Sequence, residues 1–357
     1  MLSYNNISWD NQKVNTLSVL FQKLSGEIHL LADPPLTFKR ECVICTPTLA
    51  RLEEVMPSFF SIAANIIAPV FIIAGLSALI DRHFRPDARA LSGIAVYLLT
   101  PSLVLDSIAH STLQAGEVWQ IVAMAFLNSL TMVLLGMGIA RALRFERELA
   151  TGFILTVALL NTGNYGLPVS DFAFGKEGLQ RAVIFFLASS VWTNTVGIYV
   201  ASRGTGTVRQ ALGNVFKSPL IYAMVIGFVL NTTGAALPLP LERAVNLLSQ
   251  ATVPFMLIVL GLQLSRTSLT RHLTPLTLAV FVRLVVGPLL AIGWAALLGV
   301  SDLTRQVSIL QAAMPSGVMS SVLATLFGGD ARFVAATILL TTLASMATLT
   351  VLLAYLM

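Results

Sequence analysis

Two short polar segments interrupt long apolar runs of this sequence, and each contains a proline. The first reads NTGNYGLP and ends at Pro168, and the second reads QAAMPSG and surrounds Pro315. Proline lacks a backbone donor and breaks a helix interior, so both segments predict free backbone groups beside polar side chains. Such groups, together with helix N-termini, bind a carboxylate or an amide without covalent chemistry. The predicted binding residues are Asn161, Asn164, Tyr165, Gly166, Pro168, Gln311, Pro315 and Ser316.

Arg283 and Asp171 are two of the charged residues that lie inside apolar runs, where a charge costs about 2.5–3.5 kcal/mol on insertion scales. Arg283 could pair with an anionic ligand or with a carboxylate of the protein, or its side chain could snorkel to the membrane surface. Asp171 could bind a coupling proton or cation, or it could cap the helix that follows Pro168. The sequence leaves both choices open.

Patterns typical of enzymes are missing from the sequence. The four histidines form no HExxH pair, and there is neither a GxSxG elbow nor a glycine-rich loop ending in Lys-Ser or Lys-Thr. Cys42 and Cys45 form one CxxC pair without a second pair to complete a metal site. We therefore expect no enzymatic activity, no metal and no cofactor, so that any transport would be driven by a gradient or by the membrane potential.

The composition of the chain indicates a membrane protein, so the residues named above would lie within membrane-spanning helices. Charged residues make up 11% of the chain and apolar types 56%, against about 25% charged residues in typical soluble domains. The mean hydropathy is +0.82. About 20 apolar residues form one membrane-spanning helix. Ten such stretches are predicted, at 57–80, 90–109, 117–140, 149–173, 182–202, 218–234, 244–264, 274–299, 306–327 and 332–356.

Prolines recur at a nearly constant offset between the two halves of the chain. The offsets are 150, 153 and 147 residues, for the pairs Pro69 and Pro219, Pro101 and Pro254, and Pro168 and Pro315. Because five spans per half is an odd number, the second half would enter the membrane inverted relative to the first. Inverted repeats of this kind are typical of secondary transporters.

Basic residues predict the orientation of the spans. Twelve of them fall in one set of alternate loops and four in the other, which places the first set in the cytoplasm. Both ends of the ten-helix core are then expected on the non-cytoplasmic side of the cell inner membrane. Four regions are predicted: a polar leader at 1–55, a first repeat at 56–202, a cytoplasmic linker at 203–217 and a second repeat at 218–357. The leader is expected to be disordered or non-native, because Met56 fits a natural start.

Three segments carry a resemblance to a known family. NTGNYGLP followed by FAFGKEGL, FVRLVVGP at Phe281–Pro288 and QAAMPSG resemble motifs of the auxin efflux carrier family, which includes plant auxin carriers and bacterial malonate and malate carriers. The likeness extends from Pro57 to Met357. It implies a fold related to bile-acid-symporter-like transporters, elevator-type alternating access and a homodimer formed through scaffold helices. The substrate site would then be lined by Asn161, Asn164, Pro168, Gln311 and Pro315.

The predicted fold is an all-α membrane protein of ten transmembrane helices, built as two inverted five-helix repeats with crossed, broken fourth and ninth helices. The predicted function is that of a secondary transporter, or permease, of a small organic anion such as malonate or malate. The expected partners are that anion, the lipid bilayer and a second copy of the chain, with no nucleic acid. Two alternatives stay open: a cation- or proton-coupled exchanger on the same fold, and a membrane solute sensor that does not transport.

Overall fold

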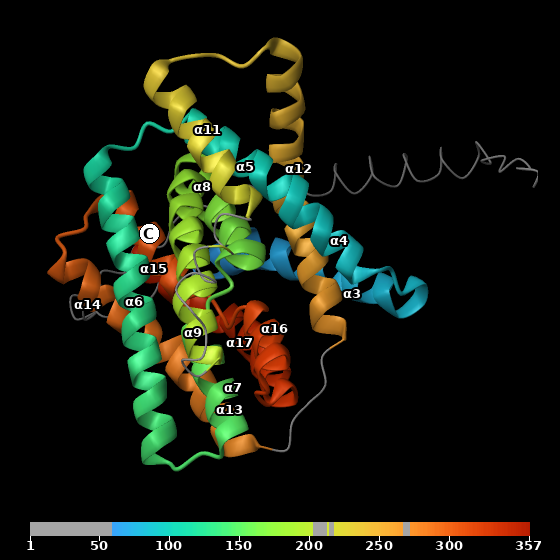
Figure 1. Ribbon diagram of the computed structural model, residues 1–357, viewed down its shortest axis with the longest axis vertical. Helices are drawn as coiled ribbons and strands as arrows, with labels where there is room; N and C mark the ends of the chain where they lie inside the picture. Colours follow the sequence, from blue (N-terminus) through green and yellow to red (C-terminus); the bar gives the residue numbers. More distant parts are fainter. Residues whose placement is uncertain (1–58, 203–212, 214–217, 267–271) are drawn as a thin grey trace, which may run out of the picture. The chain divides into compact units, whose positions relative to one another are not determined.

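The computed structural model describes residues 59–202, 213, 218–266 and 272–357, and the regular structure in these residues is helical (Figure 1). Among them, the one strand-like pairing is an isolated antiparallel bridge between Leu160 and Ser316. Helices suit an apolar chain because they satisfy their own backbone polar groups in lipid. The predicted all-helical membrane protein is confirmed for this part of the chain. The leader, 1–55, and most of the linker, 203–217, lie outside the described residues.

Seven helical stretches of the described residues are long and apolar enough to cross a membrane. A shorter apolar helix, Pro219–Thr233, has 15 residues. These helices indicate a multi-pass membrane protein, while the arrangement as ten helices in two inverted repeats stays a prediction. The seven stretches are Phe59–Phe84, Ala88–Ala109, Ala115–Ala142, Thr162–Ala201, Leu239–Ser265, Leu273–Leu297 and Ala331–Leu356.

Several helices of the N-terminal part contain π-helical turns, labelled η, in which the helix widens by one residue. Pro69 and Pro101 each lie in the first turn after such a widening, where a missing backbone donor costs little. In chain order the elements are η2 (Ala63–Ile67), α3 (Ala68–Phe84), α4 (Ala88–Ile94), η3 (Ala95–Leu99), α5 (Thr100–Ala109), α6 (Ala115–Ala142), α7 (Arg147–Ala158), η4 (Thr162–Gly166), α8 (Leu167–Trp192), η5 (Thr193–Gly197) and α9 (Ile198–Ala201).

The first interruption lies earlier in the chain than the sequence predicted. We expected the helix to break at Pro168, but the non-helical residues follow Ala158, the last residue of α7. Pro168 instead occupies the first turn of α8, directly after η4. A first-turn position tolerates proline because its backbone N–H would have no intrahelical partner there. A second change of direction occurs inside α8 at Gly175, whose φ of 63° and ψ of −158° divide this helix into two.

The C-terminal part repeats this mixture of continuous and interrupted helices. Pro254 lies inside the continuous helix α12, whereas Pro315 lies in the non-helical segment between α15 and α16, as predicted. The elements are α11 (Pro219–Thr233), α12 (Leu239–Ser265), α13 (Leu273–Phe281), η6 (Val282–Val286), α14 (Gly287–Leu297), α15 (Asp302–Ala312), α16 (Met319–Phe327) and α17 (Ala331–Leu356).

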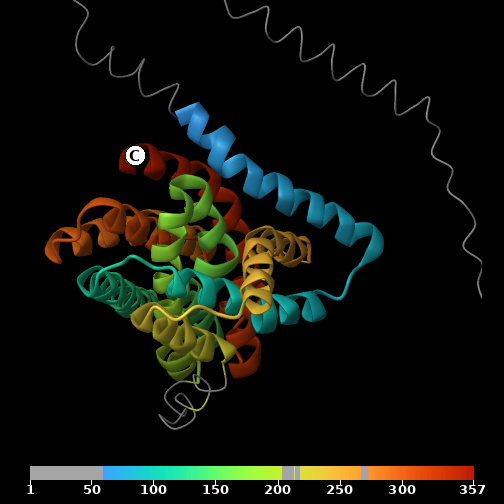
Figure 2. The ribbon, with the colours of Figure 1, turned by 90° about the horizontal axis from the view of Figure 1, so that it is seen from above.

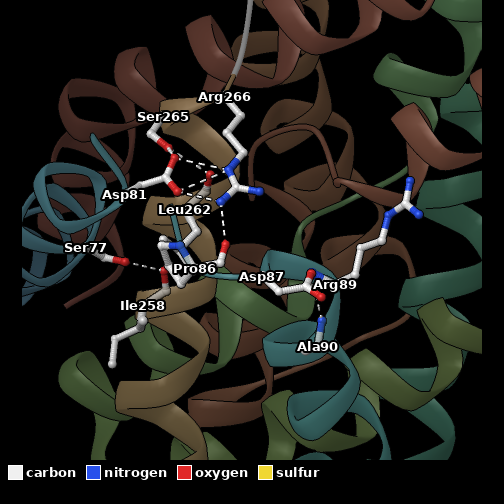
Figure 3. A network of polar contacts seen from close by, with 10 residues as sticks. All are labelled: Ser77, Asp81, Pro86, Asp87, Arg89, Ala90, Ile258, Leu262, Ser265 and Arg266. Carbon is white, nitrogen blue, oxygen red and sulfur yellow. Dashed lines mark hydrogen bonds and ion pairs between the residues drawn. The ribbon is translucent and has the colours of Figure 1, made fainter. Parts of the chain in front are cut away.

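One group of helices, the α12 group, consists of α3, α4, α5, α11 and α12. Helix α12 packs against α3 and α5, and α11 packs against α5 (Figure 1). Polar contacts tie α3 to the C-terminal end of α12: the Arg266 guanidinium pairs with the Asp81 carboxylate and also donates to the Pro86 carbonyl (Figure 3). Ser265 Oγ donates to the same carboxylate, and Ser77 Oγ donates to the Ile258 carbonyl at 2.7 Å.

A second group, the α8 group, consists of α6, α7, α8 and α13 to α17. Helix α8 lies between α6 and α15 on one side and α12 on the other (Figure 2). A partly buried network joins α8, α6 and α15, because Arg181 donates to Glu117 Oε1 at 2.9 Å and to Thr304 Oγ1 at 3.0 Å. Thr304 Oγ1 also donates to the Glu117 carboxylate. The two groups meet where α12 contacts η4 and α8, and where α5 contacts α8.

Candidate functional site

The two interrupted helices meet at their interruptions. Asn161 N donates to the Pro315 carbonyl at 2.9 Å, and Gly317 N donates to the Leu159 carbonyl at 2.8 Å. These two bonds form the antiparallel bridge at Leu160 and Ser316. Backbone groups that the interrupted helices cannot satisfy therefore satisfy each other, as a buried backbone requires. We call this meeting point the crossing; it consists of residues 159–168 and 311–318.

Two glycines allow the close approach at the crossing. A Cβ on Gly317 would lie 2.6 Å from the Leu160 carbonyl oxygen and 2.8 Å from its carbon. A Cβ on Gly166 would lie 2.4 Å from Gln311 Oε1. Both distances are shorter than van der Waals contact. A side chain at Gly317 would push the two interruptions apart because it meets backbone atoms, whereas a side chain at Gly166 would displace the Gln311 amide.

Two buried amide side chains at the crossing retain unused hydrogen-bonding atoms. Asn161 is buried, and its Nδ2 makes no hydrogen bond within the described residues. Gln311 is fully buried; its Nε2 donates to Ser170 Oγ at 3.1 Å, whereas its Oε1 accepts no hydrogen bond from the described residues. Gly166 contacts both residues, because its N–H donates to the backbone carbonyl of Asn161 while its Cα faces the Gln311 side chain. Since buried polar atoms nearly always have partners, these amides are the candidates at the crossing to bind a ligand.

Two further predicted residues connect the crossing to neighbouring helices. Asn164 Nδ2 lies 3.5 Å from Gln263 Oε1 of α12, which makes it a polar contact between the crossing and the α12 group. Tyr165 is fully buried, its hydroxyl hydrogen-bonds Ser345 Oγ of α17 at 2.9 Å, and its ring packs edge to face on Phe71 of α3. Tyr165 therefore fixes the position of η4 against α3 and α17.

The remaining residues of the crossing hold its backbone. Pro168, Pro315 and Ser316 are buried. The Ser316 N–H donates to Thr341 Oγ1 at 3.2 Å, and the Ser316 hydroxyl donates to the Thr156 carbonyl at 2.8 Å. The Ser316 hydroxyl proton is thus used within the protein, so this side chain can offer a ligand only its oxygen lone pairs.

Arg283 lies at the crossing, and its side chain is fully buried. Its Nη1 donates to the Val157 carbonyl at 2.8 Å, and its Nη2 donates to the Ala312 carbonyl. The alternative of a snorkelling side chain is wrong, because a side chain that reaches the membrane surface would be exposed. Among the described residues, no carboxylate forms an ion pair with Arg283.

Asp171 lies apart from the amides of the crossing. It lines a cavity of about 970 Å³ between α5, α8 and α12, together with Asp106, Lys176, Glu242 and Arg243. The alternative that Asp171 caps a helix is wrong, because α8 begins at Leu167 without a side-chain cap. The structure thus brings the predicted residues of both interruptions together and places Asp171 in a separate, more accessible cavity.

Several polar residues near the crossing were missed from the sequence. Gln263 is the one amide in the apolar stretch 251–264 of α12, and its distance from Asn246 and Gln250 was the available signal. Thr341 and Ser345 lie four residues apart in α17, so they face the same side of the helix. Ser170 and Thr156 bond to the crossing but resemble ordinary small residues of membrane helices, so no sequence signal marked them.

Comparisons with known proteins match nearly the whole described chain. The family model described as "Membrane transport protein" matches residues 62–214 and 208–353. An uncharacterized transporter of Methanocaldococcus jannaschii is 31% identical over 262 residues, which cover 71% of this chain and 85% of the relative. An uncharacterized transporter of Methanothermobacter thermautotrophicus is 27% identical over 74% of this chain and 87% of the relative. A putative malonate transporter of Rhizobium meliloti is 27% identical over 53% of this chain and 62% of the relative.

Proposed function

This chain belongs to the membrane transport protein family of auxin efflux carriers, and from that premise we propose that it is a secondary transporter of a small organic anion. The observation that carries the proposal is the crossing, where the buried Asn161 Nδ2 and Gln311 Oε1 have no partner in the described residues. A dicarboxylate such as malonate or malate is the proposed substrate, supported by the similarity to a protein described as a putative malonate transporter.

The proposed binding mode uses neutral donors and helix ends. The helical turns that start at Thr162 and at Met319 begin at the crossing, so their N-termini carry partial positive charge there. One substrate carboxylate would accept a hydrogen bond from Asn161 Nδ2. The second carboxylate would be joined to Gln311 Oε1 by a water molecule that donates to both oxygens. Burial strengthens these bonds because little water competes for them.

The proposed transport cycle is a sliding movement of the α8 group past the α12 group. In this proposal the chain forms ten helices in two inverted repeats, the α12 group is the fixed scaffold and forms the interface of a homodimer, and the α8 group carries the substrate. The Asn164–Gln263 contact of 3.5 Å would break during the movement, since it joins the two groups. The cavity that contains Asp171 borders both groups and is the proposed route by which the substrate enters or leaves.

The proposed location is the cell inner membrane, with both ends of the ten-helix core on the non-cytoplasmic side. The alternative of a cation- or proton-coupled exchanger has one specific observation in its favour, the carboxylate of Asp171 in the accessible cavity. Ionophores test whether an ion gradient drives transport: they would abolish substrate accumulation if a proton or cation gradient drives it, and would leave electroneutral exchange of anions intact. A solute sensor would bind the substrate without moving it.

The test is uptake of radiolabelled malonate into vesicles reconstituted with purified protein. We expect Asn161→Ala to lower uptake by about 10- to 100-fold, because a hydrogen bond to a charged group contributes about 1.5–3 kcal/mol. The variant should still fold, since Asn161 Nδ2 bonds to nothing in the described protein. The matched control is Asn65→Ala, an exposed asparagine in η2 whose side chain bonds only Ser61 among the described residues. Equal uptake by both variants would refute the site.

A further inference from the structure

Arg283 joins the C-terminal ends of two different helices. Val157 is the second-last residue of α7, and Ala312 is the last residue of α15. The two nitrogens of the Arg283 fork donate to one carbonyl of each. Arg283 reaches both from η6, and Gly287 leaves room for the guanidinium, because a Cβ there would lie 2.8 Å from Arg283 Nη2.

The helix ends around Arg283 determine the net charge at the crossing. The last carbonyls of a helix have no intrahelical partner and carry partial negative charge, equivalent to about half an elementary charge. Two helices, α7 and α15, end at the crossing, and two helical segments, those beginning with η4 and α16, start there. Two negative and two positive ends nearly cancel. The full charge of the Arg283 guanidinium, which stays protonated in proteins, leaves an excess of about one positive charge.

The bidentate contact requires arginine. A planar guanidinium presents donors in a fixed fork that reaches two acceptors at once, whereas the lysine ammonium is a compact charge on a flexible stem. A buried charge in a membrane is costly, so it persists where it has partners and a role. The partners of Arg283 in the described residues are backbone carbonyls, which bear no full negative charge to neutralise it.

We propose that Arg283 is a positioning residue that locks the two interrupted helices together and makes the crossing selective for anions by their charge. This inference rests on the proposed function, because it assigns the charge preference of the same site. Arg283 acts through the helix ends and its own field, and the substrate is held by the amides of the crossing. Loss of the charge should therefore weaken binding in proportion to the charge on the substrate.

The experiment compares two substrates of similar length in reconstituted vesicles: malonate with both carboxyls ionised, and its monomethyl ester, which carries one negative charge. In Arg283→Gln we expect the KM for the monoester to rise about tenfold and that for malonate about a hundredfold, because the interaction doubles with the charge. Arg283→Lys should retain most of the preference for malonate but lower kcat for both substrates, since an ammonium keeps the charge without the fork.

The control is Arg305→Gln, an arginine of α15 whose side-chain bond, to the Tyr355 hydroxyl, is exposed. It should leave both KM values unchanged. An equal change of KM for malonate and monoester in Arg283→Gln would overturn the inference and leave a purely structural role. If that variant does not fold, Arg283→Lys decides the question: because the charge is kept, a KM that rises about tenfold more for malonate than for the monoester would overturn the inference. If the native protein transports neither substrate, the proposed function fails and the inference fails with it.

Discussion

Gly317→Ala is the most direct test of the contact between the two interrupted helices. Gly317 has no left-handed φ, so the backbone itself accepts alanine, and steric contact is the one obstacle. The new Cβ would lie 2.6 Å from the Leu160 carbonyl oxygen, 2.8 Å from its carbon and 3.3 Å from Asn161 N. All three are backbone atoms, which cannot rotate away as the end of a flexible side chain can. The two segments must therefore separate.

The cost of this separation can be estimated from the bonds at the crossing. Overpacking by one methyl group in a tight interior costs about 1–3 kcal/mol. The separation also weakens the two bonds Asn161 N to Pro315 O and Gly317 N to Leu159 O, each with a net value of about 0.5–1.5 kcal/mol. Together we expect a loss of about 2–5 kcal/mol. Because the amides of the crossing would move as well, transport should fall more than tenfold, which corresponds to about 1.4 kcal/mol in binding.

Thermal unfolding in detergent and malonate uptake in vesicles measure the two effects. The matched control is Gly293→Ala in α14, where a Cβ meets nothing within 4 Å and the residue is exposed. Alanine favours helix over glycine by up to about 1 kcal/mol, so the control should unfold at the same or a slightly higher temperature. If Gly317→Ala matched this control in both assays, the reasoning from the crossing would be refuted.

Two further predictions concern the contacts that hold the α8 group together. Arg181→Ala should destabilise the protein by about 1–3 kcal/mol, because it leaves the partly buried Glu117 carboxylate without its cation. Thermal unfolding measures this loss of stability. A loss no greater than that of Arg305→Ala, which removes an exposed hydrogen bond, would contradict the prediction. Tyr165→Phe should cost about 1 kcal/mol through the lost hydrogen bond to Ser345, and Ser345→Ala should cost a similar amount. The double variant should cost less than the two single losses combined, since both remove the same bond; additive losses would argue against the contact.

The sequence alone was sufficient for the class of protein and for the segments of interest. Apolar runs of about 20 residues satisfy their backbone in lipid as helices, so the length and composition of these runs predict the spans. Proline and glycine act on the local backbone, and amides in an apolar run are conspicuous; both features identified NTGNYGLP and QAAMPSG as unusual. The family resemblance rests in part on these two segments, and the match to the family model agrees with it.

The tertiary structure decided how these segments meet and what each residue does there. The first interruption lies before η4 instead of at Pro168, because a helix that restarts after a π-helical turn accepts proline in its first turn. The partners of Arg283 are 126 and 29 residues away in the chain, and no local pattern predicts contacts over such separations. Asp171 lies in a separate cavity for the same reason, since its neighbours come from α5 and α12. Propensity acts within a few residues, whereas the crossing is made by long-range packing.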